Sequence, residues 1–356
     1  MPYKFVLIAA LVAQIVAAGL AFRLNLRYRV YSAWLLISAA AFTMAALRFS
    51  TLMDLWTEPP TIEGNLLLWA RTLTSLLGSL FLVAGLALIE PFFQQLARSQ
   101  DSLQREHRKL QSVMQETEAE LRLARSIQQN LLPKSSPSTG GLEVAGNSQP
   151  AEWTSGDYYD YVPLQDGTTA FIIADVSGHG LGPAMLASSV RASIRALART
   201  LDDVGELLTQ TNAAVSDAVS GRGFVTAFAA RIDPDTCELH YAAAGHTAYL
   251  LRSDGTRQML STDAPPMGVL AEVRLAKHCH PALESGDILI LVTDGILETT
   301  DAQGNMFGDS HLFDSVAQLH SSCAAEIVVG LFAAAHQFGG RKPQRDDNTA
   351  VIIKVP

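Results

Sequence analysis

The sequence predicts an α+β protein in which three membrane-spanning helices and a connecting helix precede a strand-rich domain. Apolar residues are concentrated in the first 90 of the 356 residues, where they form three long runs. Beyond residue 140 the pattern changes to short strand-like runs, separated by turn residues and by helical patterns. We therefore expect a membrane region over 1–90, a helical linker over 91–132 and a folded domain over 140–356.

The three N-terminal apolar runs cover residues 5–22, 30–47 and 65–89. About 20 apolar residues cross the hydrocarbon core of a bilayer, and main-chain groups there must pair within the segment, so each run is expected to be a helix. A soluble domain of hydrophobic helices is the alternative for the whole region. A cleaved secretory signal is a further alternative for the first run.

The distribution of charge around these runs indicates their orientation. Arg23, Arg27 and Arg29 follow the first run, whereas residues 50–64 carry three acidic side chains and no Lys or Arg. Basic loops favour the cytoplasmic side of a membrane. The sequence thus predicts a multi-pass protein of the cytoplasmic (inner) membrane, with its N-terminus outside and every residue after 90 in the cytoplasm.

The predicted linker helix contains no glycine or proline between Pro91 and Pro133. A seven-residue apolar spacing keeps one seam of a helix facing a partner helix, so we expect a short parallel coiled coil and a homodimer. A single solvated helix is the alternative, because the pattern is imperfect. The turn-rich stretch 133–141 ends the helix. The residues that fall seven apart are Leu96, Leu103, Leu110, Thr117, Ala124 and Leu131.

The charge of the C-terminal part restricts its partners. Residues 133–356 carry 14 basic and 26 acidic side chains, a net charge of −12. Such a domain is a poor binder of nucleic acid, since phosphate backbones attract the opposite charge, but it suits a cation site. Cys237, Cys279 and Cys323 form no close pair, so they indicate neither a disulfide framework nor a zinc ribbon.

The C-terminal domain alternates predicted strands and helices in a way that favours antiparallel strand pairs with segregated helices. Turn signals such as "DPDT" and "SDG" link successive strands. We expect helices at 181–199, 203–220 and about 311–338. The expected strands cover 169–175, 224–233, 238–245, 248–255, 287–295 and 349–355.

Aspartates stand where several of these strands begin or end. Asp175 and Asp294 end two apolar strands, Asp346 and Asp347 directly precede the last strand, and Asp157 lies in "SGDYYD". These carboxylates could meet at one edge of a sheet, where a cation would have to neutralise them. Sites made only of oxygen atoms suit magnesium or manganese. Any one of these aspartates alone could instead be a turn or cap residue.

Four stretches carry a resemblance to a known family. "SGDYYDY", "IADVSGHGLGPAMLAS", "GDILILVTDGILETTDAQGNMFG" and "RDDNTAVII" resemble, in order and spacing, the metal-dependent type 2C (PPM) serine/threonine protein phosphatases of the SpoIIE/RsbU branch. The stretch "ELRLARSIQQNLLP" resembles the segment that leads into that domain. The resemblance covers about residues 120–356.

The resemblance implies a PPM-type β-sandwich flanked by helices, with two divalent cations, Mn²⁺ or Mg²⁺, at one end. Matched motif by motif, the metal ligands and catalytic residues would be Asp157, Asp175, Asp294 and Asp346. Val176 would bind through its main-chain carbonyl, and Asp347 competes with Asp346 because the last motif permits two registers. A metal-activated water would attack the phosphoryl group, so no protein nucleophile is needed.

The resemblance also implies a substrate. It would be a phosphoserine or phosphothreonine on a small STAS-domain protein, the anti-sigma-factor antagonist of a partner-switching signalling pathway. Two other classes of function remain open. One is a phosphatase-like binding module with weak or no catalysis, against which the intact aspartates argue. The other is a membrane sensor whose cytoplasmic domain is a scaffold.

Other residues in the motifs have roles that the resemblance leaves open. His179 stands two residues beyond the histidine position of eukaryotic-type relatives, so that role does not transfer to it. His246, in "AAAGHTAYL", suits a structural hydrogen bond, Glu298 could support the ligands, and Arg345 could meet substrate phosphate. The helix at 181–199 directly follows the Asp175 loop and is a candidate regulatory switch.

Overall fold

The computed structural model describes residues 2–28, 31–57, 64–137, 139–219, 223–340 and 344–356. The chain divides into two compact units, Met1–Gln115 and Glu116–Pro356. Parts of three predicted loops, 29–30, 58–63 and 341–343, lie outside the described residues. The α+β class is confirmed, because the first unit is helical and the second combines sheets with helices.

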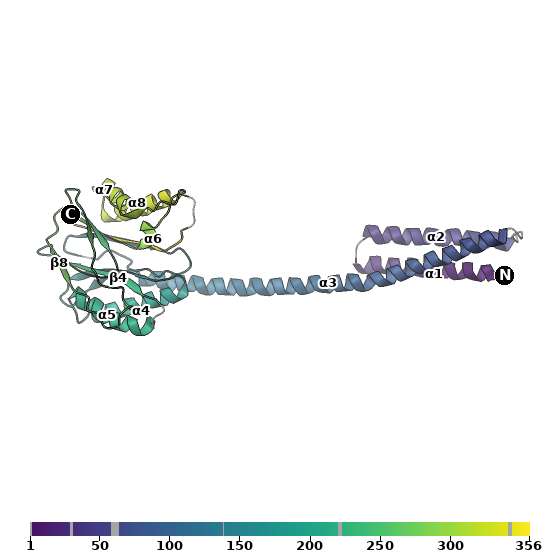
Figure 1. Ribbon diagram of the computed structural model, residues 1–356, viewed down its shortest axis with the longest axis horizontal. Helices are drawn as coiled ribbons and strands as arrows, with labels where there is room; N and C mark the ends of the chain where they lie inside the picture. The colour runs from purple at the N-terminus through teal and green to yellow at the C-terminus, as the bar shows by residue number, and fades with distance from the viewer. Residues whose placement is uncertain (1, 29–30, 58–63, 138, 220–222, 341–343) are drawn as a thin grey trace. The chain divides into compact units, whose positions relative to one another are not determined.

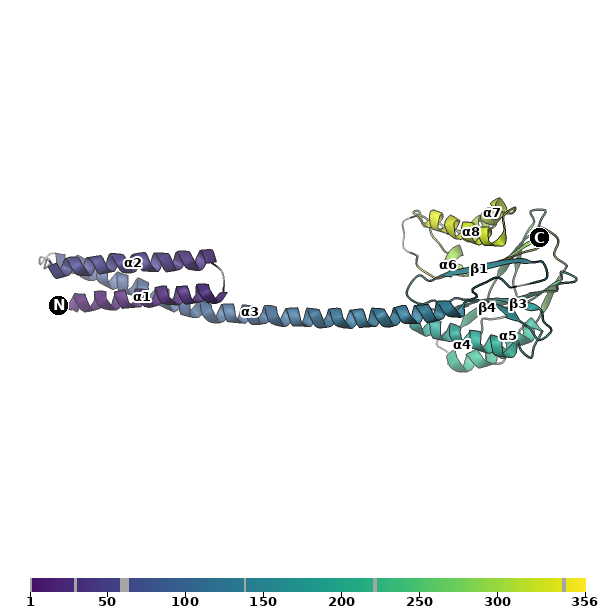
Figure 2. The same cartoon turned by 180° about the vertical axis from the view of Figure 1, so that it is seen from behind.

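The first unit consists of α1 (Pro2–Tyr28), α2 (Tyr31–Thr57) and the first part of α3 (Gly64–Leu131), which lie side by side (Figures 1 and 2). Within the described residues, two helices contain an apolar stretch long enough to cross a membrane, Lys4–Leu26 and Trp69–Leu131. The sequence predicted three such spans. The middle helix, α2, contributes the shorter apolar stretch Ile37–Met53 among its described side chains.

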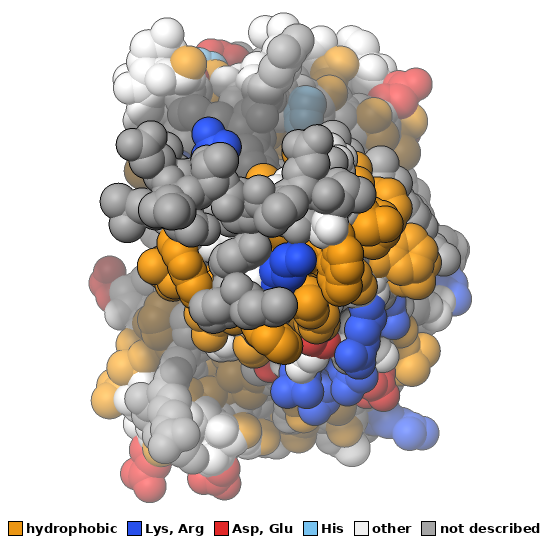
Figure 3. Space-filling model, turned by 90° about the vertical axis from the view of Figure 1, so that its right-hand side faces the viewer, with side chains coloured by type: hydrophobic (Ala, Val, Ile, Leu, Met, Phe, Trp, Pro, Cys, Tyr) orange, Lys and Arg blue, Asp and Glu red, His pale blue; other side chains and the backbone are white. Residues whose placement is uncertain are grey.

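Large apolar side chains on these helices face outward. Phe5, Phe81 and Leu88 are 73%, 75% and 75% exposed, and hydrophobic side chains gather on the surface in the view of Figure 3. A broad exposed apolar surface marks a region that another apolar medium or molecule covers. These helices are therefore compatible with membrane association.

The third predicted span and the predicted linker form one helix. Pro91 lies inside α3, although proline removes one main-chain donor from an α-helix. Leu96, Leu103 and Leu110, three of the residues spaced by seven, are 45%, 67% and 63% exposed. The seam predicted for a coiled coil is thus uncovered in the single chain.

The second unit contains two five-stranded antiparallel sheets, with strand orders β1-β10-β9-β6-β7 and β2-β3-β4-β5-β8. The sequence missed β1, β2, β7 and β8, whose short or polar runs lack a clear strand pattern. The strands are β1 (Glu143–Gln149), β2 (Tyr158–Pro163), β3 (Thr169–Val176), β4 (Val225–Ile232), β5 (Leu239–Ala244), β6 (Ala248–Leu251), β7 (Arg257–Leu260), β8 (His278–His280), β9 (Ile288–Val292) and β10 (Asn348–Lys354).

Helices cover the outer faces of the two sheets (Figures 1 and 2). The first sheet is covered by α7 (Gly308–Gln318) and α8 (Ala324–Gly339), with the short α6 (Asp294–Leu297) beside them. The second sheet is covered by α4 (Leu181–Leu197) and α5 (Val204–Val219). The single helix expected over 311–338 is therefore two helices, because the chain turns at 319–323.

The core between the sheets follows the two-residue period of the strands. In β3, Phe171 and Ile173 point between the sheets, whereas Ala170, Ile172 and Ala174 point toward α4 and α5. Both faces of the strand are buried, which explains its continuous apolar run. This alternation decides which side chains reach the inner space at the end of each strand.

At Gly205, the helix α5 packs closely against the main chain of another segment of the same domain. A Cβ atom there would lie 2.7 Å from both Leu275 O and Lys277 N, which are main-chain atoms that cannot rotate away. We expect Gly205→Ala to lower the free energy of unfolding by about 1–3 kcal/mol. The midpoint of thermal unfolding of the full chain in detergent measures this.

Gly182→Ala is the matched control, because no heavy atom lies within 4 Å of the added Cβ in α4. Removing a glycine from a helix should raise stability by roughly 0.5–1 kcal/mol. Equal effects of the two substitutions would contradict the close packing of α5.

Candidate metal centre

The inner faces of both sheets end in polar side chains at one end of the sandwich. In β2, Tyr159 and Tyr161 point between the sheets, and the same alternation places Asp157 on that face just before the strand. In β3 the alternation that turns Ile173 inward does the same for Asp175. Two carboxylates from neighbouring strands thus reach the space between the sheets.

The opposite sheet contributes Thr293, Asp347 and Thr349 by the same rule. Leu291 of β9 and Val351 of β10 point inward, so residues two and four positions away along each strand do likewise. Thr293 Oγ1 donates a hydrogen bond of 2.8 Å to Asp157 Oδ2. The two sheets are therefore joined directly through one of the predicted metal ligands.

Asp157 is the most buried of these carboxylates, at 4% exposure. Burial, together with the charge of Asp175, raises the pKa of Asp157 well above its ordinary value, although hydrogen bonds from Thr349 and Thr293 act in the opposite direction. A buried carboxylate facing another carboxylate is stable as an anion only beside a positive charge.

Asp175 is half-buried at the end of β3. Its burial, and the nearby charges of Asp294 and Asp346, raise the pKa of Asp175 to about 7. Burial and the charges of Asp346 and Glu298 likewise raise the pKa of Asp294. These shifts show that the predicted ligands from separate segments of the chain are close enough to repel one another.

Asp294 is positioned differently from the sequence-based expectation. It begins α6 instead of ending a strand, and Thr293 occupies the preceding N-cap position. The helix fits here because Gly295 lies directly against the main chain of Asp347, where any side chain would collide. The exposed Asp294 therefore stands at the edge of the site, next to the segment of Asp346 and Asp347 that precedes β10.

Asp346 and Asp347 make different interactions. Asp347 is buried, and its two carboxylate oxygens accept hydrogen bonds of 2.8 Å from the main-chain amides of Ala151 and Gly156. Asp346 is exposed, and its Oδ1 accepts a hydrogen bond from the amide of Asp347. Asp347 thus holds the segment that leads to Asp157, whereas Asp346 faces the open side.

The main chain around Val176 also faces this site. A Cβ atom on Gly156 would lie 2.8 Å from the carbonyl oxygen of Val176, so only glycine permits the observed approach. The amide of Val176 donates to the carbonyl of Gly156, and Gly178 turns the chain with φ +95°. The loop before α4 is thereby packed against the segment that carries Asp157.

The chemistry of these residues suits a divalent cation, but their carboxylates do not converge on a single position. Carboxylates with raised pKa values provide oxygen ligands for a hard cation. Among the described residues, however, no group of three or more His, Cys, Asp and Glu side chains is arranged as a ready metal cage. The observation in favour of a metal is thus the crowding of carboxylates that repel one another and have raised pKa values.

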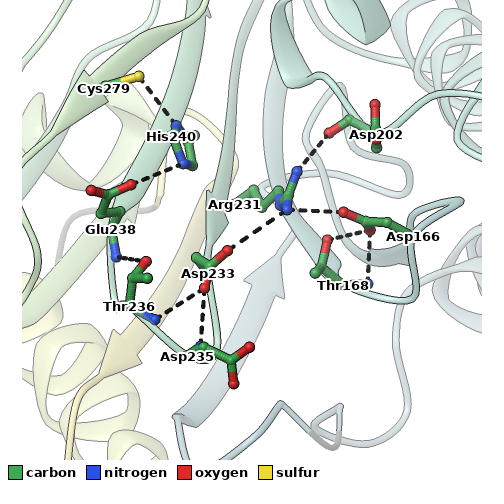
Figure 4. Close-up of polar contacts among 10 residues, drawn as sticks. All are labelled: Asp166, Thr168, Asp202, Arg231, Asp233, Asp235, Thr236, Glu238, His240 and Cys279. Carbon is green, nitrogen blue, oxygen red and sulfur yellow. Dashed lines mark hydrogen bonds and ion pairs between the residues drawn. The ribbon is translucent and has the colours of Figure 1, made fainter.

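The opposite end of the second sheet provides a comparison (Figure 4). Arg231, which pairs with Ala170 at the start of β3, lies 2.9 Å from Asp166 and 4.0 Å from Asp233. Burial opposes the shift, but hydrogen bonds from Thr168 and the charge of Arg231 lower the pKa of Asp166. The aspartates at this end lie beside the positively charged Arg231, whereas the aspartates around Asp175 have raised pKa values.

The two histidines of interest lie in different surroundings. His179 is exposed, and its Nδ1 lies 3.5 Å from Glu152. His246 is buried, with its Nδ1 3.1 Å from Thr226 Oγ1, and Thr226 is the register partner of Asp175. Burial lowers the pKa of His246 to about 4. This contact agrees with the structural hydrogen bond expected for His246.

A buried ion pair beside the site was not anticipated from the sequence. Asp160 accepts two hydrogen bonds from Arg195, at 2.6 and 2.7 Å, and one from Tyr158 at 2.8 Å. Arg191, one turn earlier on α4, lies 3.8 Å from the same carboxylate. The four-residue spacing of the two arginines on one helix face was the available signal.

Comparison with known proteins agrees with this fold and these motifs. The family described as Stage II sporulation protein E (SpoIIE) matches residues 165–356. Phosphoserine phosphatase RsbU of Bacillus subtilis is 30% identical over 252 residues, which cover 70% of this chain and 74% of that protein. The chain belongs to the SpoIIE family of metal-dependent serine/threonine protein phosphatases.

The chain is also similar to a second phosphoserine phosphatase and to a solved type 2C domain. Phosphoserine phosphatase RsbP of Bacillus subtilis is 25% identical over 244 residues, or 67% of this chain and 58% of that protein. The SiaA-PP2C domain of Pseudomonas aeruginosa has a TM-score of 0.61 at 23% identity, covering 68% of this chain and 99% of that domain. The latter similarity supports the type 2C fold.

The raised pKa of Asp175 predicts how pH acts on the metal-free protein. A carboxyl group with a raised pKa in the folded state contributes most below its unfolded value near 4, and this contribution is lost as pH rises through about 7. In chelator-treated protein, Asp175→Asn should therefore raise the free energy of unfolding at pH 8 by roughly 1–3 kcal/mol. Near pH 4 the two proteins should unfold alike.

Asp166→Asn is the matched control at the opposite end of the sheet. It removes a partner of Arg231, so it should lower stability at pH 8, by less than about 1 kcal/mol for a surface pair. Thermal unfolding of the full chain at both pH values measures these effects. Equal or lower stability of Asp175→Asn at pH 8 would contradict charge repulsion at the site.

Proposed function

We propose that this chain is a membrane-anchored phosphatase that hydrolyses phosphoserine and phosphothreonine on a protein, using two divalent cations, Mn²⁺ or Mg²⁺. The observation that carries the proposal is the group of mutually repelling carboxylates where the inner faces of both sheets end. The similarity to RsbU, a phosphoserine phosphatase, supports the reaction.

In this proposal Asp157, Asp175, Asp294 and Asp346 hold the cations, and the carbonyl of Val176 assists. From the last motif we favour Asp346 over Asp347, because each carboxylate oxygen of Asp347 already accepts a main-chain hydrogen bond and has one fewer lone pair for a cation. When bound, the cations supply a water of lowered pKa and neutralise the oxygens of the phosphoryl group.

The protein itself orients the ligands. Thr293 fixes Asp157 through a 2.8 Å hydrogen bond, and Asp347 holds the preceding segment through Gly156. Arg345 lies next to Asp346 on the open side, where its guanidinium can bind a substrate phosphate. Preorganised ligands lower the cost of bringing the like charges together around a metal.

The substrate that we propose is a phosphorylated STAS-domain protein, an anti-sigma-factor antagonist in a partner-switching pathway. Support comes from the resemblance of the motifs to the SpoIIE/RsbU branch and from the relatives RsbU and RsbP, both named phosphoserine phosphatases. The acidic charge of residues 133–356 agrees with a protein substrate and with no binding of nucleic acid.

The proposed location is the cytoplasmic membrane, with three spans, the N-terminus outside and the phosphatase domain in the cytoplasm. The two long apolar helices and the shorter apolar stretch Ile37–Met53 support this arrangement. The basic residues that follow the first helix support its orientation.

The linker end of α3 is suited to control the site. Gln128 hydrogen-bonds the main chain of Ser155 at both N and O, at 2.9 and 2.6 Å, two residues before Asp157. Arg191 of α4 donates a 3.0 Å hydrogen bond to Leu131 O. A displacement of this helix end would therefore act on the segment of Asp157 and on the helix that follows the Asp175 loop. In this proposal the linker pairs with a second copy and transmits the state of the membrane region.

Metal-dependent hydrolysis tests the proposed activity. The purified full chain in detergent should hydrolyse p-nitrophenyl phosphate with Mn²⁺ and lose this activity with EDTA. Asp157→Asn and Asp175→Ala should each reduce kcat/KM by roughly 100-fold or more, because each removes a ligand charge.

Asp254→Asn is the control for that experiment, since Asp254 is an exposed turn residue that accepts a hydrogen bond from the Thr256 amide. It should retain wild-type activity. Metal-independent hydrolysis, or full activity of Asp175→Ala, would refute the proposed centre.

The proposed dimer is tested at the exposed leucines of the linker. The double substitution Leu103→Glu and Leu110→Glu should raise the dimer dissociation constant at least about tenfold, because pairing would bury like charges. It should also lower phosphatase activity. Light scattering of the full chain in detergent measures the dimer.

Gln104→Glu with Gln111→Glu adds the same charge at the adjacent positions and should leave the dimer intact. A monomeric wild-type chain, or a dimer that survives the leucine substitutions, would show that the linker does not pair in this way.

A further inference from the structure

A cavity of about 270 Å³ opens beside the candidate metal centre. Gly295, next to Asp294, and Asp346 both line it, so it is continuous with the proposed site. Its remaining walls come from the end of β1, the segment after α6, the last turns of α8, and the residues that lead into β10.

The walls of the cavity are fixed by close packing. Gly295 lies against the main chain of Asp347, and a Cβ atom on Gly339 of α8 would lie 3.0 Å from Thr299 Cγ2. Gln344 Nε2 donates hydrogen bonds of 2.7 Å to Gln149 O and to Asp346 O. The space is therefore part of the framework of the domain.

The lining combines an apolar floor with hydrogen-bond acceptors. Phe332 and Ala335 are buried at its base, and Met306 is 60% exposed. Asn348 also lines the cavity, but its Oδ1 atom is buried away from the open space and has no hydrogen-bond partner among the described residues.

Among the described residues that line the cavity, the two carboxylates of Glu298 and Asp346 outnumber the one guanidinium of Arg345, which favours a donor that is cationic. The Glu298 carboxylate lines it, and Arg345, the opposite charge on the same rim, stands next to Asp346 on the side where substrate phosphate would arrive. The domain as a whole carries a net charge of −12. Long basic side chains place an apolar stem along apolar walls and a charged donor at the tip.

We propose that this cavity is a specificity pocket for the substrate, which accepts a Lys or Arg side chain located near the phosphoserine. The proposal rests on the proposed function, since it deepens the assignment of a phosphoprotein substrate. The apolar floor contacts the stem of the side chain, and the exposed Glu298 carboxylate accepts hydrogen bonds from its tip.

Fluorescent phosphoserine peptides test the pocket. The set places lysine, arginine, norleucine, alanine or glutamate at each of three positions on either side of phosphoserine. The dissociation constant for the full chain with Mn²⁺ is measured by fluorescence polarisation. At one position, lysine or arginine should bind at least about fivefold more tightly than norleucine, the effect of one hydrogen bond.

Two substitutions that fill the cavity should remove this preference. Ala335→Leu occupies the floor, and His336→Trp occupies the exposed rim, where the fold tolerates a larger side chain. Val329→Trp is the matched control, because Val329 lies on α8, is 68% exposed and does not line the cavity. It should keep the preference.

Equal binding of all peptides by the wild-type chain, or a preference that persists in both filled variants, would overturn the pocket. Hydrolysis of p-nitrophenyl phosphate, measured in parallel, reports on the proposed activity by itself. Loss of that hydrolysis with the binding preference intact would refute the phosphatase assignment and leave the pocket supported.

Discussion

Repulsion among carboxylates at one end of the sandwich is the constraint on which the rest of the site depends. Asp157 and Asp175 are held between two sheets, where burial and the charges of neighbouring aspartates raise their pKa values. The repulsion costs free energy, but the fold imposes it. The alternation of side chains along each strand directs the residue at the end of its inner face toward the other carboxylates. A divalent cation would turn the same crowding into tight ligation.

Specific contacts outside the group of carboxylates hold the segments of the site in place. Asp347 uses both oxygens to hold the Asp157 segment, Gly295 permits α6 to approach β10, and Gln128 ties the linker end to Ser155. These contacts come from segments far apart in the chain. They connect the site both to the linker helix, through which we propose regulation, and to the cavity beside α8, where we propose substrate selection.

The sequence predicted the α+β class, the helices at α4 and α5 and most central strands, because buried strands such as β3 have continuous apolar runs. It missed β2 because "YYDYVP" contains a buried aspartate, Asp160, whose partners Arg191 and Arg195 lie on α4. It placed Asp294 at a strand end, although α6 begins there. It could not distinguish Asp346 from Asp347, since that difference depends on amides almost 200 residues away. The local sequence pattern indicates which residues are buried and with what period. The strand β2, the start of α6 and the difference between Asp346 and Asp347 depend instead on tertiary contacts.

Anomalous X-ray diffraction from crystals of the full chain grown with Mn²⁺ is the most direct test of the central claim. The account predicts two manganese peaks between the sheets, contacted by Asp157, Asp175, Asp294 and Asp346 and by the carbonyl of Val176. Asp347 should retain its hydrogen bonds to Ala151 and Gly156. Manganese bound elsewhere, or ligated by Asp347 in place of Asp346, would contradict the account.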